Sequence, residues 1–273
     1  MVRSLTSGVS GIQQFQSKLD VIGNNIANSN TFGFKTGRAD FEDSFSQSLQ
    51  ASGGGTVQIG SGVGTGAVRS LFDQGTISRT GVSGDMAVDG EGFFVVRDPV
   101  SGDQFVTRAG DFRLDNSGYL VTNQGYRIQG FGDGALSSRG DIQVDATGKP
   151  EGDTTGMDDF RVDPDGKINV VLGSGKSFVR GQVLMQRFQD PSALRKEGNN
   201  LYSGIEEAGA LPDTDVPGTN GLGKIRGESL EGSNVDLSNE FTNLITTQRG
   251  FQASARIITT TDELLQEVVN LKR

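Results

Sequence analysis

Two stripes of apolar residues, one at each end of the chain, limit most strongly what this sequence can fold into. Both stripes advance in alternating steps of four and three residues, which is the period of one helical face and is close to a heptad. Near the start the apolar positions are Leu5, Val9, Ile12, Leu19, Ile22 and Ile26. Near the end they are Leu237, Phe241, Leu244, Phe251, Ile258 and Leu265. The spacing predicts two amphipathic helices, the second from about 235 to 271 after the N-cap candidates Ser233, Asn234 and Asp236.

These helices bury too little apolar surface to be stable alone. Ordering the backbone of a helix of about 37 residues costs more free energy than burying about eight apolar side chains returns. We therefore expect the two ends to pair as a coiled-coil-like core and to gain further buried surface from neighbouring copies. The two stripes together form the predicted polymerisation core.

The middle of the chain has the pattern of a β-rich domain. Short apolar runs such as FFVV (93–96) and INVVL (168–172) lie between turn sequences rich in Gly, Asp and Asn. FRLDNSGYLV (112–121) and FRVDPDGKINV (160–170) repeat one strand, turn and strand pattern. The predicted fold is mixed α and β, with a helical segment at 1–36, an extended or irregular linker at 37–72, a β-rich domain at 73–231 and a helical segment at 232–273.

The composition excludes several classes of function. The chain has no Cys and no His, so zinc sites built on these residues, cysteine nucleophiles and Ser-His-Asp triads are excluded. A net charge of −9 argues against a nucleic-acid-binding surface. No apolar run approaches the length of about 20 residues that spans a bilayer, and the N-terminus does not have the pattern of a cleaved signal peptide. We expect no cofactor, no metal and no catalytic site.

Two glycine-rich motifs resemble nucleotide-binding loops, but each has a simpler interpretation. GSGKS (173–177) resembles the end of a phosphate loop, yet the pattern needs Gly where the chain has Val170, and the following residues alternate like a strand. The glycines at 60–66 lack the spacing of a dinucleotide fingerprint. We interpret the first as a hairpin turn and the second as part of an irregular link.

Two acidic motifs also have simpler interpretations. Asp163 and Asp165 precede Gly166 as in a calcium loop, but the first and last ligand positions would be Arg161 and Leu172, which cannot bind Ca²⁺. Asp89 and Glu91 could do acid–base chemistry, but nothing else in the sequence builds a pocket around them. We interpret both as turns.

Four stretches of the sequence resemble the bacterial flagellar hook and basal-body rod family. The N-terminal stretch GVSGIQQFQSKLDVIGNNIANSNTFGFKTGRADF (8–41) is similar to the family's N-terminal signature, in which a helix ends in an Asn-rich run followed by Gly-Phe-Lys. DQGTISRTGVSGDMAVDGEGFFVV (73–96) and the block at 107–131 resemble its central motifs, and 228–273 resembles its C-terminal helix. The resemblance covers both ends and most of the centre.

This resemblance implies a structural protein of the flagellum. Terminal helices of many copies would stack into an inner tube around an export channel, and the β domain would form the outer wall. The implied partners are other copies of the chain, neighbouring rod, hook and junction proteins, the type III export apparatus and an assembly cap. Export beyond the cytoplasm would need no cleaved signal, and Phe41 and Phe45 match the form of a short export signal in the family.

The Asn-rich run is predicted to end the inner helix and to turn the chain outward. Asn and Gly tolerate left-handed backbone conformations, and Asn amides can satisfy backbone groups where water is excluded. The residues of this predicted turn are Asn24, Asn25, Asn28, Asn30, Gly33, Phe34 and Lys35.

Hook and distal rod subunits are both compatible with the sequence. The C-terminal helix is more similar to hook subunits, whereas a length of 273 residues leaves no room for the outer domain that hook subunits carry. The helix favours a hook subunit slightly. A different class also fits, namely a ligand-binding or hydrolytic β domain flanked by oligomerising helices, and it would need a pocket with convergent polar groups.

Overall fold

The structure confirms a mixed fold with a helix at each end and a β-rich centre. It is a computed structural model that describes residues 2–44, 46–50, 56–60, 62–134, 136, 138–145, 147, 156–211 and 215–271. In this part of the chain there are two α-helices, twenty strands and one short 3₁₀ helix. They form two compact units, of which the first contains 1–29, 36–71 and 235–273, and the second contains 30–35 and 72–234.

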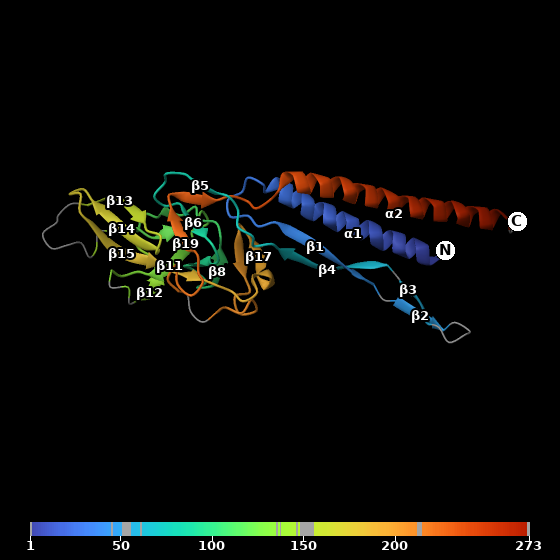
Figure 1. Cartoon of the computed structure of the whole chain (residues 1–273), viewed down its shortest axis with the longest axis horizontal. Coiled ribbons are helices and arrows are strands. Elements are labelled where there is room, and N and C mark those ends of the chain that lie inside the picture. The colour runs from blue at the N-terminus through green and yellow to red at the C-terminus, as the bar shows by residue number, and fades with distance from the viewer. Residues whose placement is uncertain are drawn as a thin grey trace. The chain divides into compact units, whose positions relative to one another are not determined.

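The first unit is built on an antiparallel helix pair, α1 (Val2–Ala27) and α2 (Leu237–Leu271) (Figure 1). The pair is close-packed where glycines meet the other helix. A Cβ atom on Gly8 would lie 3.1 Å from Ile258 Cγ1, and one on Gly250 would lie 2.6 Å from the ring of Phe15. These glycines lower the intrinsic stability of each helix but allow the two backbones to approach.

The ends of both helices are set by polar side chains. Asp236 caps α2, because its carboxylate accepts hydrogen bonds from the backbone N–H of Ser238 (2.9 Å) and Asn239 (3.3 Å). At the end of α1, the Asn28 side chain donates to the backbone O of Asn24 (2.9 Å). Since α1 continues to Ala27, Asn24 and Asn25 are helical, and the predicted turn begins only at Asn28.

Residues 37–72, for which we expected an extended or irregular linker, are extended and pair as strands where the structure describes them. β1 (Gly37–Asp43) pairs with β4 (Val63–Ser70), and β2 (Ser46–Gln50) pairs with β3 (Thr56–Gly60), both antiparallel. α1 holds the β1–β4 pair in place, since Gln14 accepts a hydrogen bond from Thr65 Oγ1 (2.5 Å). The strand pattern is hard to detect in the sequence because glycines replace the side chains that would alternate.

The second unit contains a sheet of twelve antiparallel strands with the main order β13-β14-β15-β11-β7-β8-β18-β17. Strands β10 and β12 add to β11, β9 adds to β10, and β16 adds to β7. Two further pairs, β6 with β19 and β5 with β20, join the first strands of the unit to its last.

The elements of the second unit are β5 (Ile77–Arg79), β6 (Met86–Asp89), β7 (Phe93–Arg97), β8 (Gln104–Thr107), β9 (Arg113–Leu114), β10 (Leu120–Val121), β11 (Arg127–Phe131), β12 (Arg139–Asp141), β13 (Met157–Val162), β14 (Lys167–Leu172), β15 (Ser177–Val183), β16 (Met185–Gln186), η1 (Pro191–Ala193), β17 (Arg195–Gly198), β18 (Leu201–Ser203), β19 (Lys224–Gly227) and β20 (Ser229–Glu231).

Strand β7 shows how the core is built. Phe94 and Val96 point into one buried cluster, with Met86, Leu120, Ile128 and Val170 among its members. Phe93 and Val95 point to the opposite side, into a second cluster with Phe188 and Tyr202. Successive side chains of a strand alternate between the two faces of the sheet, so a strand buried on both faces has a continuous apolar sequence such as FFVV.

The predicted hairpin turns are confirmed. Gly102, Gly118 and Gly166 have positive φ values of 82°, 80° and 78° between paired strands. The GSGKS motif is the turn between β14 and β15, with Gly175 at φ 80°, and a strand follows it instead of a helix. The phosphate-loop resemblance therefore has no structural counterpart.

Candidate functional site

The predicted polymerisation core divides into residues that face the partner helix and residues that face outward. On α1, Ile22 is 3% exposed, and Leu5, Ile12, Leu19 and Ile26 are half-buried. On α2, the half-buried members are Leu244, Phe251, Ile258 and Leu265. Val9, Leu237 and Phe241 are exposed, the last by 51%. The helix pair therefore uses only part of the apolar surface that the two stripes supply.

The outward surface of α2 is more apolar than the stripe predicts. Ile245 and Ile257 do not belong to the predicted stripe, and both are about half exposed. The complete set of exposed large apolar residues on α2 is Leu237, Phe241, Ile245, Ile257, Leu264, Val268, Val269 and Leu271. These residues lie on more than one side of α2, since Phe241 and Ile257 are about 160° apart around the helix, and so many exposed apolar side chains favour contacts with other molecules. The two isoleucines were missed because heptad counting follows one helical face at a time.

A buried amide connects the two helices to the first strand. Asn25 is 2% exposed, and its Oδ1 accepts a hydrogen bond from the N–H of Gly37 (2.9 Å). Its Nδ2 donates to the carbonyl of Gly37 (2.8 Å) and to Glu240 Oε1 on α2 (3.2 Å). Asn25 thus satisfies both backbone groups of Gly37, which is the role expected for amides of the Asn-rich run.

The Gly-Phe-Lys signature leads into a buried ion cluster of the second unit. Lys35 Nζ lies 2.7 Å from Glu231 Oε1 on β20, and both side chains are fully buried. Lys35 also donates to the carbonyl of Asp73 (2.8 Å), and Glu231 Oε1 accepts from the N–H of Gly75 (2.9 Å). The backbone reinforces the contact, because the N–H of Gly33 donates to the carbonyl of Glu231 (2.8 Å).

A second cation completes the cluster. Arg108 is 3% exposed, its Nη1 lies 3.6 Å from Glu231 Oε2, and its guanidinium stacks 4.9 Å from the ring centre of Phe93. Burial lowers the pKa of Lys35 and of Arg108, and the Glu231 carboxylate counteracts both shifts. The pKa of the neighbouring Tyr202 hydroxyl is raised by its burial. One carboxylate therefore compensates two buried cations, so Glu231 is the residue on which the cluster depends.

Gly33 and Phe34, two further residues of the predicted turn, lie next to this cluster. Phe34 is 6% exposed, with Lys196 Nζ 4.5 Å from its ring centre, and Lys196 donates to the carbonyl of Lys35 (2.9 Å). Burial lowers the pKa of Lys196. Gly33 has a φ of 68°, and a Cβ there would lie 2.5 Å from the backbone N of Ala109, so only Gly fits. Asn30 is exposed.

Only one of the two predicted export-signal residues lies among the described residues. Phe41 is half-buried on β1, with Lys18 Nζ of α1 5.9 Å from its ring centre. Phe45 lies outside the described residues.

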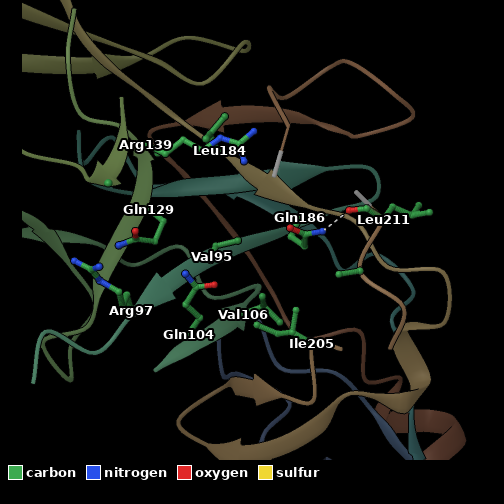
Figure 2. Close-up of a pocket in the computed structure, with 13 residues that line it drawn as sticks. Val95, Arg97, Gln104, Val106, Gln129, Arg139, Leu184, Gln186, Ile205 and Leu211 are labelled. Carbon is green, nitrogen blue, oxygen red and sulfur yellow. Dashed lines mark hydrogen bonds between the residues drawn. The ribbon is translucent and has the colours of Figure 1, made fainter. Parts of the chain in front are cut away.

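The β-rich unit contains a cavity of about 470 Å³ on one face of the sheet (Figure 2). Its polar lining consists mainly of Arg97, Arg139 and three glutamines, Gln104, Gln129 and Gln186. The last two already donate hydrogen bonds to other groups of the protein. Gln129 Nε2 donates to Asp141 (2.6 Å), and Gln186 Nε2 donates to the carbonyl of Leu211 (2.9 Å). Among the described residues, the lining thus offers amides and guanidinium groups but no carboxylate or hydroxyl nucleophile.

The acidic motifs are engaged in the fold. Asp89 Oδ2 lies 2.7 Å from Arg226 Nη2, and Glu91 Oε2 lies 2.7 Å from Arg187 Nε. Asp163 accepts a hydrogen bond from Asn169 (2.6 Å) at the β13–β14 turn. The described part of the chain contains no cluster of three or more residues that could hold a metal ion.

Among the described residues, neither helix is long and apolar enough to cross a membrane.

Three family models match different parts of the chain. The model for flagella basal body rod protein matches 5–35, that for the flagellar hook protein FlgE/F/G D1 domain matches 87–170, and that for the C-terminal region of the flagellar basal body rod FlgEFG protein matches 226–271. The matched regions contain α1, much of the sheet and α2.

Curated relatives match the chain over its whole length. The flagellar basal-body rod protein FlgG of Bacillus subtilis (strain 168) is 41% identical over 281 residues, which cover 100% of both chains. The flagellar hook protein FlgE of Borreliella burgdorferi is 27% identical over 444 residues, again covering 100% of both. A crystal structure of Helicobacter pylori flagellar hook protein FlgE2 is 16% identical, covers 66% of this chain and 47% of that chain, and has a TM-score of 0.22.

Proposed function

This chain belongs to the flagellar hook and basal-body rod protein family, and from that membership we propose that it is a rod-type subunit whose copies stack their terminal helices into a hollow axial tube. The observation that carries this proposal is that eight large apolar side chains of α2 remain exposed after the helices have paired. Burying a fully exposed side chain of this kind gains about 1.5–3 kcal/mol, and since most of these are about half exposed, each would gain about 1 kcal/mol on packing against neighbouring copies.

The β-rich unit suits an outer wall that does not itself polymerise through its sheet. Its edge strands carry charged residues, as in the RKEG sequence of β17, where all four residues are exposed. The other edge strand, β13, exposes Asp158, Asp159 and Arg161. Charged edge strands prevent sheets from adding to one another. Copies would then associate through their helices, and the sheet would form the rigid outer part of each subunit.

We assign the chain to the rod rather than the hook on the basis of length. The alignment with the rod relative covers both chains completely in 281 positions, whereas the alignment with the hook relative needs 444. A hook relative therefore carries residues with no counterpart in this chain. The sequence of α2 favours a hook subunit slightly, but a single helix weighs less than agreement over the whole length.

Electron microscopy of basal bodies from cells that lack this gene tests the assignment. We expect a shortened rod without the outer rings. A complete rod with its rings but without a hook would make this chain the hook subunit and overturn the assignment to the rod. Intact flagella would contradict the axial role altogether.

We further propose that the chain leaves the cytoplasm through the flagellar type III export apparatus, unfolded and without a cleaved signal, and adds to the growing structure under an assembly cap. Its neighbours there would be other rod, hook and junction proteins. A signal at Phe41 and Phe45 would act before β1 folds, because Phe41 is half-buried against α1 in the folded chain. Secretion of the Phe41→Ala/Phe45→Ala variant should fall, while Phe32→Ala should be secreted normally.

We propose no enzymatic activity, and one observation keeps a ligand-binding role open to test. The cavity of about 470 Å³ has the size of a small-molecule site and polar groups in its lining (Figure 2). Saturable binding of a small molecule that is lost in Gln104→Ala would support such a role. Self-association of the purified chain without any ligand supports the structural role instead.

A further inference from the structure

A second cavity of the β-rich unit lies away from the one in Figure 2, at a place where four segments of the chain meet. Its volume is about 330 Å³. The walls come from 30–32, 107–111, 122–124 and 199–201, all of which belong to the second unit. This volume is at the lower end of the range for small-molecule sites, so the cavity suits a ligand of one or two rings.

Hydrogen bonds hold the walls of this cavity in place. Asn200 joins three of the lining segments, because its Nδ2 donates to the carbonyl of Phe32 (2.9 Å) and its own carbonyl accepts from Thr107 Oγ1 (2.8 Å). Asn199 and Asn200 have φ values of 51° and 58° in the tight turn between β17 and β18. The cavity is therefore preformed, and a ligand would bind without the cost of ordering these walls.

The lining of the cavity is mostly polar. Among the described residues, eight of the eleven that line it are polar, namely four carboxamides, three threonines and one carboxyl. The side chains of Asn30, Gln124 and Asn199 are exposed and take part in no hydrogen bond within the described part of the chain. A carboxamide has both N–H donors and a carbonyl acceptor, so these three can bind groups that donate and accept at once.

The charge of the lining argues for an uncharged ligand. Its one ionisable side chain among the described residues is Asp111, whose carboxyl accepts a hydrogen bond from Asn123 Nδ2. Burial raises the pKa of this carboxyl, and the nearby Asp85 carboxylate adds to the shift. No cation among the described residues lines the cavity, so an anionic ligand would meet unfavourable charge. The described residues also contain no cluster that could hold a metal ion.

An aromatic ring at the cavity adds a flat apolar surface. Phe32 is 45% exposed, and it is the one exposed aromatic residue of the second unit among the described residues. Sugar rings match this combination, because C–H bonds cover the faces of the ring and hydroxyl groups project from its edge. The faces pack on an aromatic ring, while the hydroxyl groups donate to and accept from carboxamides. A wholly apolar ligand would leave these amides unpaired.

We propose that this cavity is a binding site for an uncharged saccharide, whose ring stacks on Phe32 and whose hydroxyl groups bond to Asp111 and to the surrounding carboxamides. The site lies within one unit and needs no second copy of the chain. The inference therefore goes beyond the proposed function and does not depend on it.

Binding to the dilute, full-length chain tests the site. The probes are maltose, which offers hydroxyl groups alone, and N,N′-diacetylchitobiose, which adds acetamido groups, and saturation-transfer NMR follows each titration. We expect saturable binding of at least one disaccharide. Phe32→Ala should weaken it about ten-fold, because the stacking surface is lost, and Phe32→Tyr should stay within about two-fold of wild type, because the ring is kept.

Two further comparisons test the polar contacts. Asn199→Ala should weaken binding about five-fold. Asn116→Ala is the matched control, since it removes an exposed carboxamide in the turn between β9 and β10, outside the cavity, and should leave binding unchanged. Methyl glucuronide, which carries a carboxylate, should bind at least about five-fold more weakly than methyl glucoside.

Three results would overturn the site. They are no binding of either disaccharide at about 10 mM, equal binding by wild type and Phe32→Ala, and tighter binding of the glucuronide than of the glucoside. Circular dichroism of each variant checks that the loss of binding is not a loss of folding. Because the titration uses the dilute chain, an absence of saccharide binding leaves the proposed axial role intact, and a failure to self-associate leaves the saccharide site intact.

Discussion

Lys35 and Glu231 form a fully buried ion pair of 2.7 Å, although 196 positions separate them in the chain. The contact joins the end of the N-terminal signature to the last strand of the β-rich unit. Because Arg108 lies on the other carboxylate oxygen at 3.6 Å, Glu231 is shared by two buried cations. The signature lysine is therefore a structural residue of the second unit.

Removing the shared carboxylate should destabilise the second unit strongly. We expect Glu231→Gln to lower the free energy of unfolding by about 3–5 kcal/mol, because two cations then remain buried without a counter-charge. Chemical denaturation of the whole chain measures this. Arg226→Ala is the control, since the Arg226–Asp89 pair is largely exposed and should contribute less than about 1 kcal/mol. Equal losses in the two variants would show that the buried cluster has no special role.

Stability should also fall in acid through Asp141. Its burial alone would raise the pKa of this carboxyl, but hydrogen bonds from Gln129, Arg127 and Arg97 outweigh burial and lower it. The carboxylate thus contributes stability at pH values above the unfolded pKa of about 3.9, and this contribution is lost as the pH falls through the lower, folded pKa. Asp141→Asn should lose about 1–3 kcal/mol at neutral pH, and its difference from wild type should shrink in acid.

Asp111 supplies the control with the opposite sign. Burial raises the pKa of this carboxyl, and the nearby Asp85 carboxylate adds to the shift. Its charged form is therefore disfavoured in the fold, so the penalty is absent in acid and present at pH values above the raised pKa. Asp111→Asn should gain stability relative to wild type as the pH rises through the acid range. Parallel curves of unfolding free energy against pH for both variants would contradict these assignments.

Two helical glycines should respond to alanine in opposite directions. A Cβ on Gly250 would lie 2.6 Å from the Phe15 ring, whereas a Cβ on Gly23 would meet nothing within 4 Å. Gly250→Ala should loosen the helix pair by about 1–3 kcal/mol through overpacking. Gly23→Ala should stabilise α1 by about 1 kcal/mol through helix propensity. Hydrogen exchange of α1 and α2 measures both, and greater protection in Gly250→Ala would contradict the close packing.

Assembly should depend on exposed apolar residues that the monomer does not use. Phe241→Asp changes a side chain that is 51% exposed, so the dilute chain should fold as wild type does while polymerisation falls at least about ten-fold. Leu244→Asp is the comparison, because Leu244 is half-buried in the helix pair and its replacement should weaken both pairing and polymerisation. Sedimentation reports polymerisation, and circular dichroism reports folding. Normal polymerisation by Phe241→Asp would remove this residue from the assembly surface.

Local sequence patterns predicted the local structure well. The cap of α2 at Asp236 and the turns at Gly102, Gly118 and Gly166 depend on residues within a few positions of one another, so the signals lie next to the structures they produce. The strand pairs within 37–72 were not predicted, because these strands are supported by α1, as in the hydrogen bond between Thr65 and Gln14. The strand propensity of a segment does not reveal that a helix elsewhere in the chain will pack against it.

The candidate site was harder to predict because its contacts are distant in sequence. Lys35 was expected only as part of a turn, and neither Glu231 nor Arg108 has any local feature that marks a buried ion cluster. Ile245 and Ile257 were missed for a different reason, since they lie outside the single face that heptad counting follows. Which side chains of a helix remain exposed is known only when the position of the helix that packs against it is known.

The strand pairs β5–β20 and β6–β19 bear on the order in which the chain folds. They join residues 77–89 to residues 224–231. The first two strands of the second unit therefore cannot pair until its last two strands are available. A chain that emerges from a narrow conduit with its N-terminus first has no partner for β5 until position 231 has passed through. Closing so large a loop is a late event in folding. In a chain exported with its N-terminus first, these two strand pairs would therefore be the last of the second unit to form, after the strands of the large sheet, which lie between residues 93 and 203.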